Sequence, residues 1–535
     1  MKNSVKRIDT DIERIRLILM VVFIAIITLL AWQSDDAYHG YVMAKHLVEG
    51  DGFVYNIGQR ASASTAPLFT LIIAAGYFIT REMFFTSLFI CIAFSAAAYY
   101  IVTYKICKNV QQVIICFFAF ICSAGFISYT TSGLENSFLF FLAALFLKIY
   151  FSSEKYTSKQ MLELALIFSA FAMSRMDAVL YLIPMICYVF LLKRRDSSFI
   201  EAVGIGLLGL LPFILWEIFS TFYYGFPVPN TAYVKLGTDI AKIEFIKKGI
   251  WYTIFTFLND ALIILMPIAF VIIAFINKKA KYIYTAVGVI LYGIYVIYIG
   301  GDFMMGRHFT VMFLIATASI IEIMNKASAY DLRKAALYRK TITFITAFGV
   351  IYSVTFVPNI GINYLAGGRY PSMISDERMY YTGTTGLYSN IRSLIKDGRM
   401  CIEDTWNYES TDEIREAELR GNITENSPGI LVYYNSDLYL NDTYALGDPF
   451  LSKLPAIKQD NWRVGHLRRK CPEGYRESVW NHANKIENQD LAKYYDVIIF
   501  MTEGKLFDRE RIKTVIEWNL GKYNYLLDDY ISTLE

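Results

Sequence analysis

Two adjacent acids, Asp35 and Asp36, stand directly after the first apolar run of the chain. Adjacent carboxylates repel each other when both are ionised, which raises the pKa of one of them toward the range of a general base. The pair also follows Ser34 at the predicted start of a helix, where carboxylates cap backbone N–H groups and favour the positive end of the helix dipole. Acid–base chemistry and helix capping therefore both stay open for this pair.

Further ionisable residues occupy short polar connections between apolar runs. Charged side chains at membrane depth cost about 2.5 to 3.5 kcal/mol each on insertion, so their repeated presence at the ends of such runs favours a functional interpretation. Arg175 and Asp177 also suit a salt bridge within one turn, and Lys235 also suits anionic headgroups, so these alternatives stay open. The cations of these connections are Arg175, Lys235, Arg307 and His308, and the other polar candidates are Glu135, Asp177, Asn230 and Asp302.

The apolar runs between these residues predict a polytopic α-helical membrane protein. Hydrophobic residues make up 55% of the 535 residues and charged residues only 19%, which leaves too little polar surface for several soluble domains. A helix needs about 20 apolar residues to cross the hydrocarbon core of a bilayer. About 11 transmembrane helices are predicted, at 17–32, 83–104, 109–127, 136–151, 160–173, 178–192, 200–222, 255–276, 282–300, 309–325 and 341–357.

The run 67–80 is short for a crossing, and we predict an embedded helix that does not cross. With this assignment the Lys and Arg clusters of the later connections fall on the side of the N-terminus, which the positive-inside rule places in the cytoplasm. Residues 33–66 then form a large first outer loop, and the chain after residue 358 lies outside the membrane. The predicted domains are a transmembrane domain, 1–358, and an extracytoplasmic domain, 359–535.

The tail, 359–535, has the composition of a soluble domain. Apolar runs at 430–434 and 495–500 predict buried strands, and 411–420 predicts a helix, so we expect an α/β fold. Its tryptophans suit core packing and also stacking on sugars, which would make the domain carbohydrate-binding. Cys401 and Cys471 suit one disulfide on the oxidising side of a membrane, or two unrelated buried thiols.

Several short motifs, in one order and on one predicted outer face, resemble those of the GT-C glycosyltransferases, the membrane class that takes a sugar from a polyprenyl phosphate. The resemblance spans about residues 10–360 and is greatest to the terminal arabinofuranosyltransferases of mycobacterial cell-wall arabinan, which also have an exported C-terminal domain. The motifs are Asp35-Asp36, 50–56 (GDGFVYN), 132–135 (SGLE), 174–177 (SRMD), 224–225 (YG) with 229–231 (PNT), and 300–303 (GGDF).

The resemblance implies an inverting transfer of a sugar, with a pentofuranose as one candidate, from a polyprenyl-phosphate donor to a cell-envelope glycan at a bacterial inner membrane. By position, Asp35 is then the base for the acceptor hydroxyl, and Asp36 orients it or binds the sugar. The lipid phosphate departs readily once its charge is neutralised, so the site needs cations rather than a general acid. Guanidinium groups bind phosphate in fork geometry. Candidates for the phosphate are Arg307, His308, Arg175 and Lys235, and candidates for sugar hydroxyls are Asp302, Asp177, Glu135 and Asn230.

The sequence also bears on other functions and ligands. A net charge of +3 gives no reason to expect a nucleic-acid partner. Asp35, Asp36 and Asp302 offer oxygen ligands for a divalent metal, but no metal or other cofactor is assigned. A membrane transporter or flippase of lipid-linked sugars is the alternative function, although transporters place their charges near the bilayer midplane and often show inverted repeats. A scaffold that binds wall polymer would leave the acid pair without a role.

Overall fold

The computed structural model describes residues 2–196, 198–238, 240–355, 373–403, 429–437, 439, 444–456 and 462–532. Within these residues the chain forms helices and a few isolated bridges, and no extended strand. It divides into two compact units that are each built from segments far apart in the sequence. Unit 1 comprises Met1–Gln33, Ser87–Pro212 and Lys242–Tyr388, and unit 2 comprises Ser34–Thr86, Phe213–Ala241 and Ser389–Glu535.

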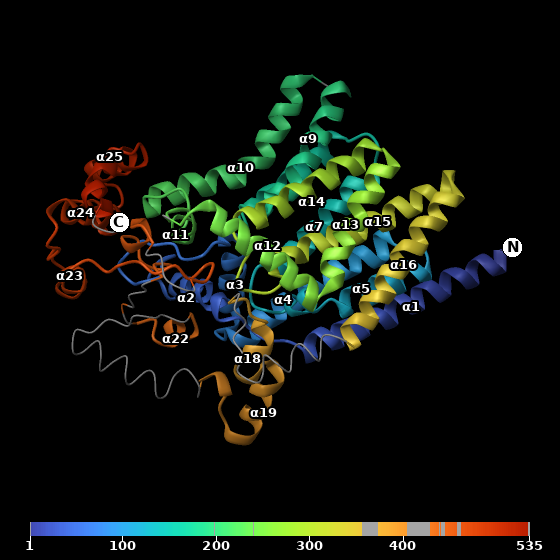
Figure 1. Cartoon of the computed structure of the whole chain (residues 1–535), viewed down its shortest axis with the longest axis horizontal. Helices are drawn as coiled ribbons and strands as arrows, with labels where there is room; N and C mark the ends of the chain where they lie inside the picture. Colours follow the sequence, from blue (N-terminus) through green and yellow to red (C-terminus); the bar gives the residue numbers. More distant parts are fainter. Residues whose placement is uncertain are drawn as a thin grey trace. The chain divides into compact units, whose positions relative to one another are not determined.

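Unit 1 is a bundle of helices. They are α1 (Lys2–Leu29), the π-helix η1 (Ile101–Ile106), α5 (Val110–Cys122), α6 (Ala124–Ser128), α7 (Asn136–Ser152), α8 (Ser158–Ala172), α9 (Val179–Asp196), α12 (Lys242–Asn259), α13 (Ala261–Asn277), α14 (Ala280–Tyr298), η2 (Arg307–Phe309), α15 (Thr310–Tyr330), α16 (Leu332–Thr355) and α18 (Glu377–Thr385). α15 packs against α7, α13 and α16, and α14 packs against α9 (Figure 1). The interior is aromatic: the ring of Phe126 stacks on those of Phe120 and Phe140, with centroids 4.7 and 4.6 Å apart.

Unit 2 is formed by the first predicted outer loop, the segment Phe213–Ala241, and the tail. Its helices are α2 (Asp35–Glu49), α3 (Pro67–Thr80), α11 (Asn230–Leu236), α22 (Gly429–Tyr434), η3 (Leu451–Lys453), α23 (Tyr475–Asn481), α24 (Gln489–Glu503), α25 (Arg509–Asn519), η4 (Asn524–Leu527) and α26 (Asp528–Ser532). Three of the five boundaries between the units fall within helices, in α4 (Phe84–Tyr100), α10 (Phe199–Tyr224) and α19 (Leu387–Asp397). One apolar cluster holds Val42 and Phe53 of the loop, Tyr224, and Leu431 and Ile498 of the tail. The tail therefore shares its core with the first loop.

Local sequence explains where the two helices of the first loop begin and end. Ser34 is extended, and α2 follows it with both acids in the first turn, the position that favours the helix dipole. Gly50 ends α2 with a φ of 101°, which glycine adopts without steric cost. α3 begins with Pro67, whose missing N–H is no loss at a first helical position. The structure confirms both predicted helices; whether α3 crosses a membrane stays a prediction.

The described residues contain fewer long apolar helices than the sequence predicts. Four stretches are long and apolar enough to cross a membrane: Phe84–Ile106, Phe199–Tyr224, Ala280–Tyr298 and Arg307–Ser328. Lys242–Asn259 and Ala261–Asn277, bent by 109° at their junction, make a fifth if they are one span. Val110–Cys122 and Asn136–Ser152, both predicted as spans, are shorter apolar helices. The chain thus carries membrane-length helices, while the count of eleven is not confirmed.

Both runs of the tail predicted as strands are helices, so the expected α/β fold is wrong for the part that the structure describes. α22 covers 430–434, and α24 covers 495–500. In α24 the buried residues Leu491, Tyr494, Tyr495 and Ile498 recur at the three- and four-residue spacing of a helix, and Asn488 caps its start. A run of five or six apolar residues cannot separate strand from helix, and the wider window carries the signal.

Other predictions about the tail have mixed outcomes. Cys401 and Cys471 are thiols in the structure, not the predicted disulfide, and Cys471 packs beside the apolar cluster of unit 2. Trp462 is buried, whereas Trp480 is 44% exposed, so only the second is placed to stack on a sugar. The predicted domain boundary at 358 and the predicted helix 411–420 lie outside the described residues.

Candidate functional site

Six predicted site residues lie in unit 1 and form one buried ionic network. The carboxylate of Glu135 accepts hydrogen bonds from Arg307 at 3.0 Å and from Arg175 at 3.3 Å. Arg175 also donates two bonds to Asp177, at 2.9 and 2.7 Å, in the fork geometry typical of guanidinium–carboxylate pairs. We call Glu135, Arg175, Asp177, Asp302, Arg307, His308 and Tyr292 the arginine network.

The second half of the arginine network is centred on a histidine. His308 Nε2 lies 3.5 Å from the Asp302 carboxylate, which is also 3.8 Å from Arg307. His308 Nδ1 lies 2.9 Å from the hydroxyl of Tyr292, which in turn donates to Asp177 at 3.2 Å. The two halves are therefore connected through the contact between Asp302 and Arg307 and through Tyr292, a residue that the sequence did not single out.

Three separate connections supply the charged side chains and the histidine, and α14 supplies Tyr292. Glu135 immediately precedes α7, and Arg175 and Asp177 lie between α8 and α9. Asp302 lies between α14 and η2, and η2 itself carries Arg307 and His308. The sequence prediction that these connections converge is confirmed within unit 1, although the pairing of each charge could not be predicted.

The two guanidinium groups of the arginine network favour the ionised form of Glu135. Burial alone would raise the pKa of Glu135, but Arg307 and Arg175 lower it below its ordinary value. Three carboxylates face two guanidinium groups, so both guanidinium charges are already matched by acids. A phosphate in contact with Arg307 or Arg175 would share their remaining N–H groups with these carboxylates.

Two glycines shape the connection that carries Asp302 and Arg307. Gly301 has a φ of +74° and Gly306 a φ of +72°, conformations that L side chains rarely adopt. A Cβ at Gly301 would lie 2.4 Å from the ring of Tyr252. The hydroxyl of Tyr252 donates to the Met304 carbonyl at 2.9 Å, so this ring supports the turn directly.

We expect Gly301→Ala to destabilise unit 1 by about 2 kcal/mol or more, because the alanine is strained at positive φ and meets Tyr252. Gly293→Ala is the matched control. Gly293 lies inside α14, where an added methyl group would meet nothing within 4 Å, so alanine should be neutral or stabilising by up to about 1 kcal/mol. Thermal unfolding of the purified variants in detergent measures both. Equal melting temperatures for the two variants would contradict this account of the turn.

The acid pair lies in unit 2, together with a histidine that the sequence analysis missed. Asp35, Asp36 and His39 each offer one ligand atom within 4.8 Å of the others. His39 stands four residues after Asp35 and three after Asp36, so all three share one face of α2. His39 Nδ1 lies 3.0 Å from the hydroxyl of Tyr55, which leaves Nε2 for another partner.

Asp35 has a structural role as well as an unusual environment. Its two carboxylate oxygens accept the backbone N–H groups of Gly429 and Ile430, each at 3.0 Å, at the start of α22. Burial raises the pKa of Asp35; His39 and the two N–H groups oppose this without cancelling it, and the charge of Asp36 adds to the rise. Asp35 therefore caps α22 and not α2, the helix that the sequence analysis expected it to cap, and its raised pKa suits a base.

Asp35, Asp36 and His39 of α2 are residue types that can bind a divalent cation. Two carboxylates and one imidazole nitrogen are ligands that Mn²⁺ or Zn²⁺ accept, while Asp302, predicted as the third metal ligand, belongs to the arginine network. The cluster does not by itself require a metal. Both carboxylate oxygens of Asp35 already have partners, the backbone N–H groups of Gly429 and Ile430.

Comparisons with known proteins add a distant structural likeness. No protein-family model matches the chain, and no curated protein matches it. Two crystal structures of ArnT from Cupriavidus metallidurans are similar to it. The structure bound to undecaprenyl phosphate has a TM-score of 0.43 at 9% identity, with 81% of this chain and 85% of that chain covered. The apo structure has a TM-score of 0.45 at 10% identity, with 80% and 85% covered. With identities and TM-scores this low, an assignment of function has to rest on the residues of this chain.

The remaining predicted residues, Asn230 and Lys235, lie on α11 in unit 2. Lys235 is exposed, whereas Asn230 is buried and accepts a hydrogen bond from Lys453 at 3.2 Å. The ammonium of Lys453 lies 4.0 Å from the ring centroid of Phe226 and 3.8 Å from that of Tyr233. Burial lowers the pKa of Lys453 well below its ordinary value. Sequence reasoning missed Lys453 because its partners lie about two hundred residues away.

Proposed function

We propose that the chain is an inverting glycosyltransferase of the GT-C type, which moves a sugar from a polyprenyl phosphate to an acceptor outside the cytoplasm. The single observation that carries this proposal is the environment of Asp35. It is a half-buried carboxylate with a raised pKa, beside Asp36 and His39, at the start of the helix that follows the first apolar helix. This is the place where the resembled family has its base.

The proposed chemistry is one displacement. The acceptor hydroxyl attacks the anomeric carbon, the bond to the phosphate oxygen breaks, and Asp35 takes the hydroxyl proton. Each carboxylate oxygen of Asp35 accepts one N–H group and keeps a second lone pair for that proton. The polyprenyl phosphate leaves as an anion, so no acid has to protonate it, and the anomeric configuration inverts.

The finer assignments are proposals of the same kind. Arg307 and His308 are proposed to neutralise the departing phosphate, with Arg175 and Lys235 as further candidates. Asp302, Asp177, Glu135 and Asn230 are proposed to bind sugar hydroxyls. A pentofuranose donor and a cell-envelope glycan acceptor follow from the arabinofuranosyltransferase resemblance.

The proposed location is a bacterial inner membrane, with the N-terminus in the cytoplasm and the tail outside, as the Lys and Arg positions of the connections indicate. A reporter fused after the last residue is expected to be active only outside the cytoplasm. Activity in the cytoplasm would contradict the proposed orientation.

The experiment that tests the activity offers a panel of synthetic polyprenyl-phosphate sugars to the purified protein. Pentofuranose, hexose and amino-sugar donors are supplied with a glycan acceptor, and products are identified by mass spectrometry. We expect one donor class to yield a glycosylated acceptor and one equivalent of polyprenyl phosphate. Failure of every donor with intact, folded protein would argue against the proposed function.

A further inference from the structure

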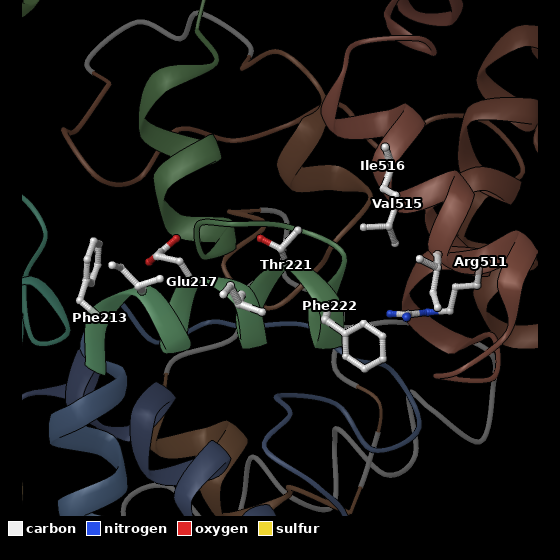
Figure 2. Close-up of a pocket in the computed structure, with 10 residues that line it drawn as sticks. Phe213, Glu217, Thr221, Phe222, Arg511, Val515 and Ile516 are labelled. Atoms are coloured by element: carbon white, nitrogen blue, oxygen red, sulfur yellow. The ribbon is translucent and has the colours of Figure 1, made fainter. Parts of the chain in front are cut away.

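Unit 2 contains a cavity that the proposed function does not use. It has a volume of about 500 Å³ and lies between α10 and α25 (Figure 2). Its walls are largely apolar, with Ile214, Ile218 and Phe222 on one helix and Ile516 on the other. Two ionisable side chains, Glu217 and Arg511, also line it.

Glu217 is an ionisable residue on a largely apolar helix. It lies in Phe199–Tyr224, one of the stretches that is long and apolar enough to cross a membrane. Among the described residues, none donates a hydrogen bond or forms an ion pair with its carboxylate. An ionised side chain on such a helix is costly without a partner, and residues of this kind mark sites of function. A cationic group in the cavity would supply the missing partner.

Arg511 is held rigidly on the other side of the cavity. Its Nε, Nη1 and Nη2 atoms donate to the carbonyl oxygens of Met501, Leu506 and Tyr223 at 2.8, 3.1 and 2.9 Å. The side chain of Arg511 is fully buried, so these bonds fix the wall of the cavity. Figure 2 shows Glu217 and Arg511 on either side of Thr221 and Phe222. The cavity therefore presents one carboxylate, that of Glu217, to an occupant.

The cavity opens on the face of α10 that suits a bilayer. Only 11% of the apolar window of this helix is buried, and the lining residues Ile214 and Ile218 are 37% and 61% exposed. Glu217 stands seven residues before Tyr224, which is roughly 10 Å from the end of the helix at 1.5 Å per residue. That depth places the carboxylate near the boundary between hydrocarbon and headgroups.

We propose that this cavity binds a membrane phospholipid with a primary amine in its headgroup, such as phosphatidylethanolamine. The ammonium group pairs with Glu217, and the acyl chains lie along Ile214 and Ile218. An ammonium group matches the carboxylate in charge and donates three hydrogen bonds, which a quaternary ammonium cannot do. The site is independent of sugar transfer.

The test is native mass spectrometry of the purified protein with lipids of identical acyl chains. Phosphatidylethanolamine, phosphatidylcholine and phosphatidylglycerol are supplied at equal concentration. We expect the unmodified protein to retain phosphatidylethanolamine about tenfold better than either other lipid. Glu217→Gln should abolish this preference, while Glu201→Gln, an exposed acid at the other end of α10, should preserve it.

A filled cavity provides the second variant. Ile218→Trp should reduce retention of all three lipids, because the indole occupies the space of the acyl chains. Thermal unfolding in detergent verifies folding, and Glu217→Gln should be at least as stable as the unmodified protein once the carboxylate is removed. Equal retention of the three lipids by the unmodified protein, an unchanged preference in Glu217→Gln, or undiminished retention by Ile218→Trp would overturn the proposal.

Discussion

Asp35→Asn is expected to lower sugar transfer by about 10²-fold or more, because the amide cannot accept the proton of the acceptor hydroxyl. Asp36→Asn should cause a smaller loss if Asp36 only orients its neighbour. In the unmodified protein the rate should fall as the pH drops through the raised pKa of Asp35, since the protonated acid is inactive as a base. Steady-state rates of product formation, measured by mass spectrometry with the active donor, give both results.

The capping role of Asp35 requires a matched control. Asparagine keeps one acceptor oxygen and loses the other, so Asp35→Asn should also cost about 1 kcal/mol in stability through α22. Asp376→Asn removes the same kind of cap from α18, where Asp376 accepts the N–H of Met379 at 3.2 Å. It should lower stability alone and leave transfer intact. Near-normal transfer by Asp35→Asn, or a comparable loss in Asp376→Asn, would show that Asp35 is not the base.

Glu135→Gln is expected to destabilise unit 1 by about 3 to 5 kcal/mol. Glu135 is the carboxylate that Arg307 and Arg175 both contact, and its removal leaves two buried guanidinium groups with less counter-charge. Thermal unfolding of the purified protein in detergent, followed by circular dichroism, measures the loss.

Glu244→Gln is the matched control for this prediction. Glu244 pairs with Lys247 at 2.8 Å, but both side chains are largely exposed, and such a pair contributes less than about 1 kcal/mol. A similar melting temperature for Glu135→Gln and Glu244→Gln would mean that the arginine network contributes little to the fold.

The sequence predictions that the structure confirms rest on two local features: the residues that begin helices and the lengths of the apolar runs. The starts of α2 and α3 follow from Asp35 after an extended Ser34 and from Pro67, both of which act within one turn of the chain. The convergence of Glu135, Arg175 and Arg307 follows from their positions at the ends of apolar runs. Which carboxylate each guanidinium contacts depends on helix packing, and no local pattern encodes that.

Long-range packing explains what the sequence did not reveal. The apolar runs of α22 and α24 are long enough to suggest strands but too short to show the helical period. The shared core of the first loop and the tail brings Phe53 and Leu431 into one apolar cluster across almost four hundred residues. His39 has a local signal, its spacing from Asp35 and Asp36 on one helix, whereas Lys453 has none.

Sugar transfer and sugar transport make opposite predictions in proteoliposomes, and this is the most direct test of the proposed chemistry. The purified protein is reconstituted with a polyprenyl-phosphate sugar labelled in the sugar, and a glycan acceptor is added outside. We predict that the label becomes covalently bound to the acceptor, with release of polyprenyl phosphate, and that Asp35→Asn prevents this. Movement of intact lipid-linked sugar between leaflets with no labelled acceptor would contradict the glycosyltransferase and identify a flippase instead.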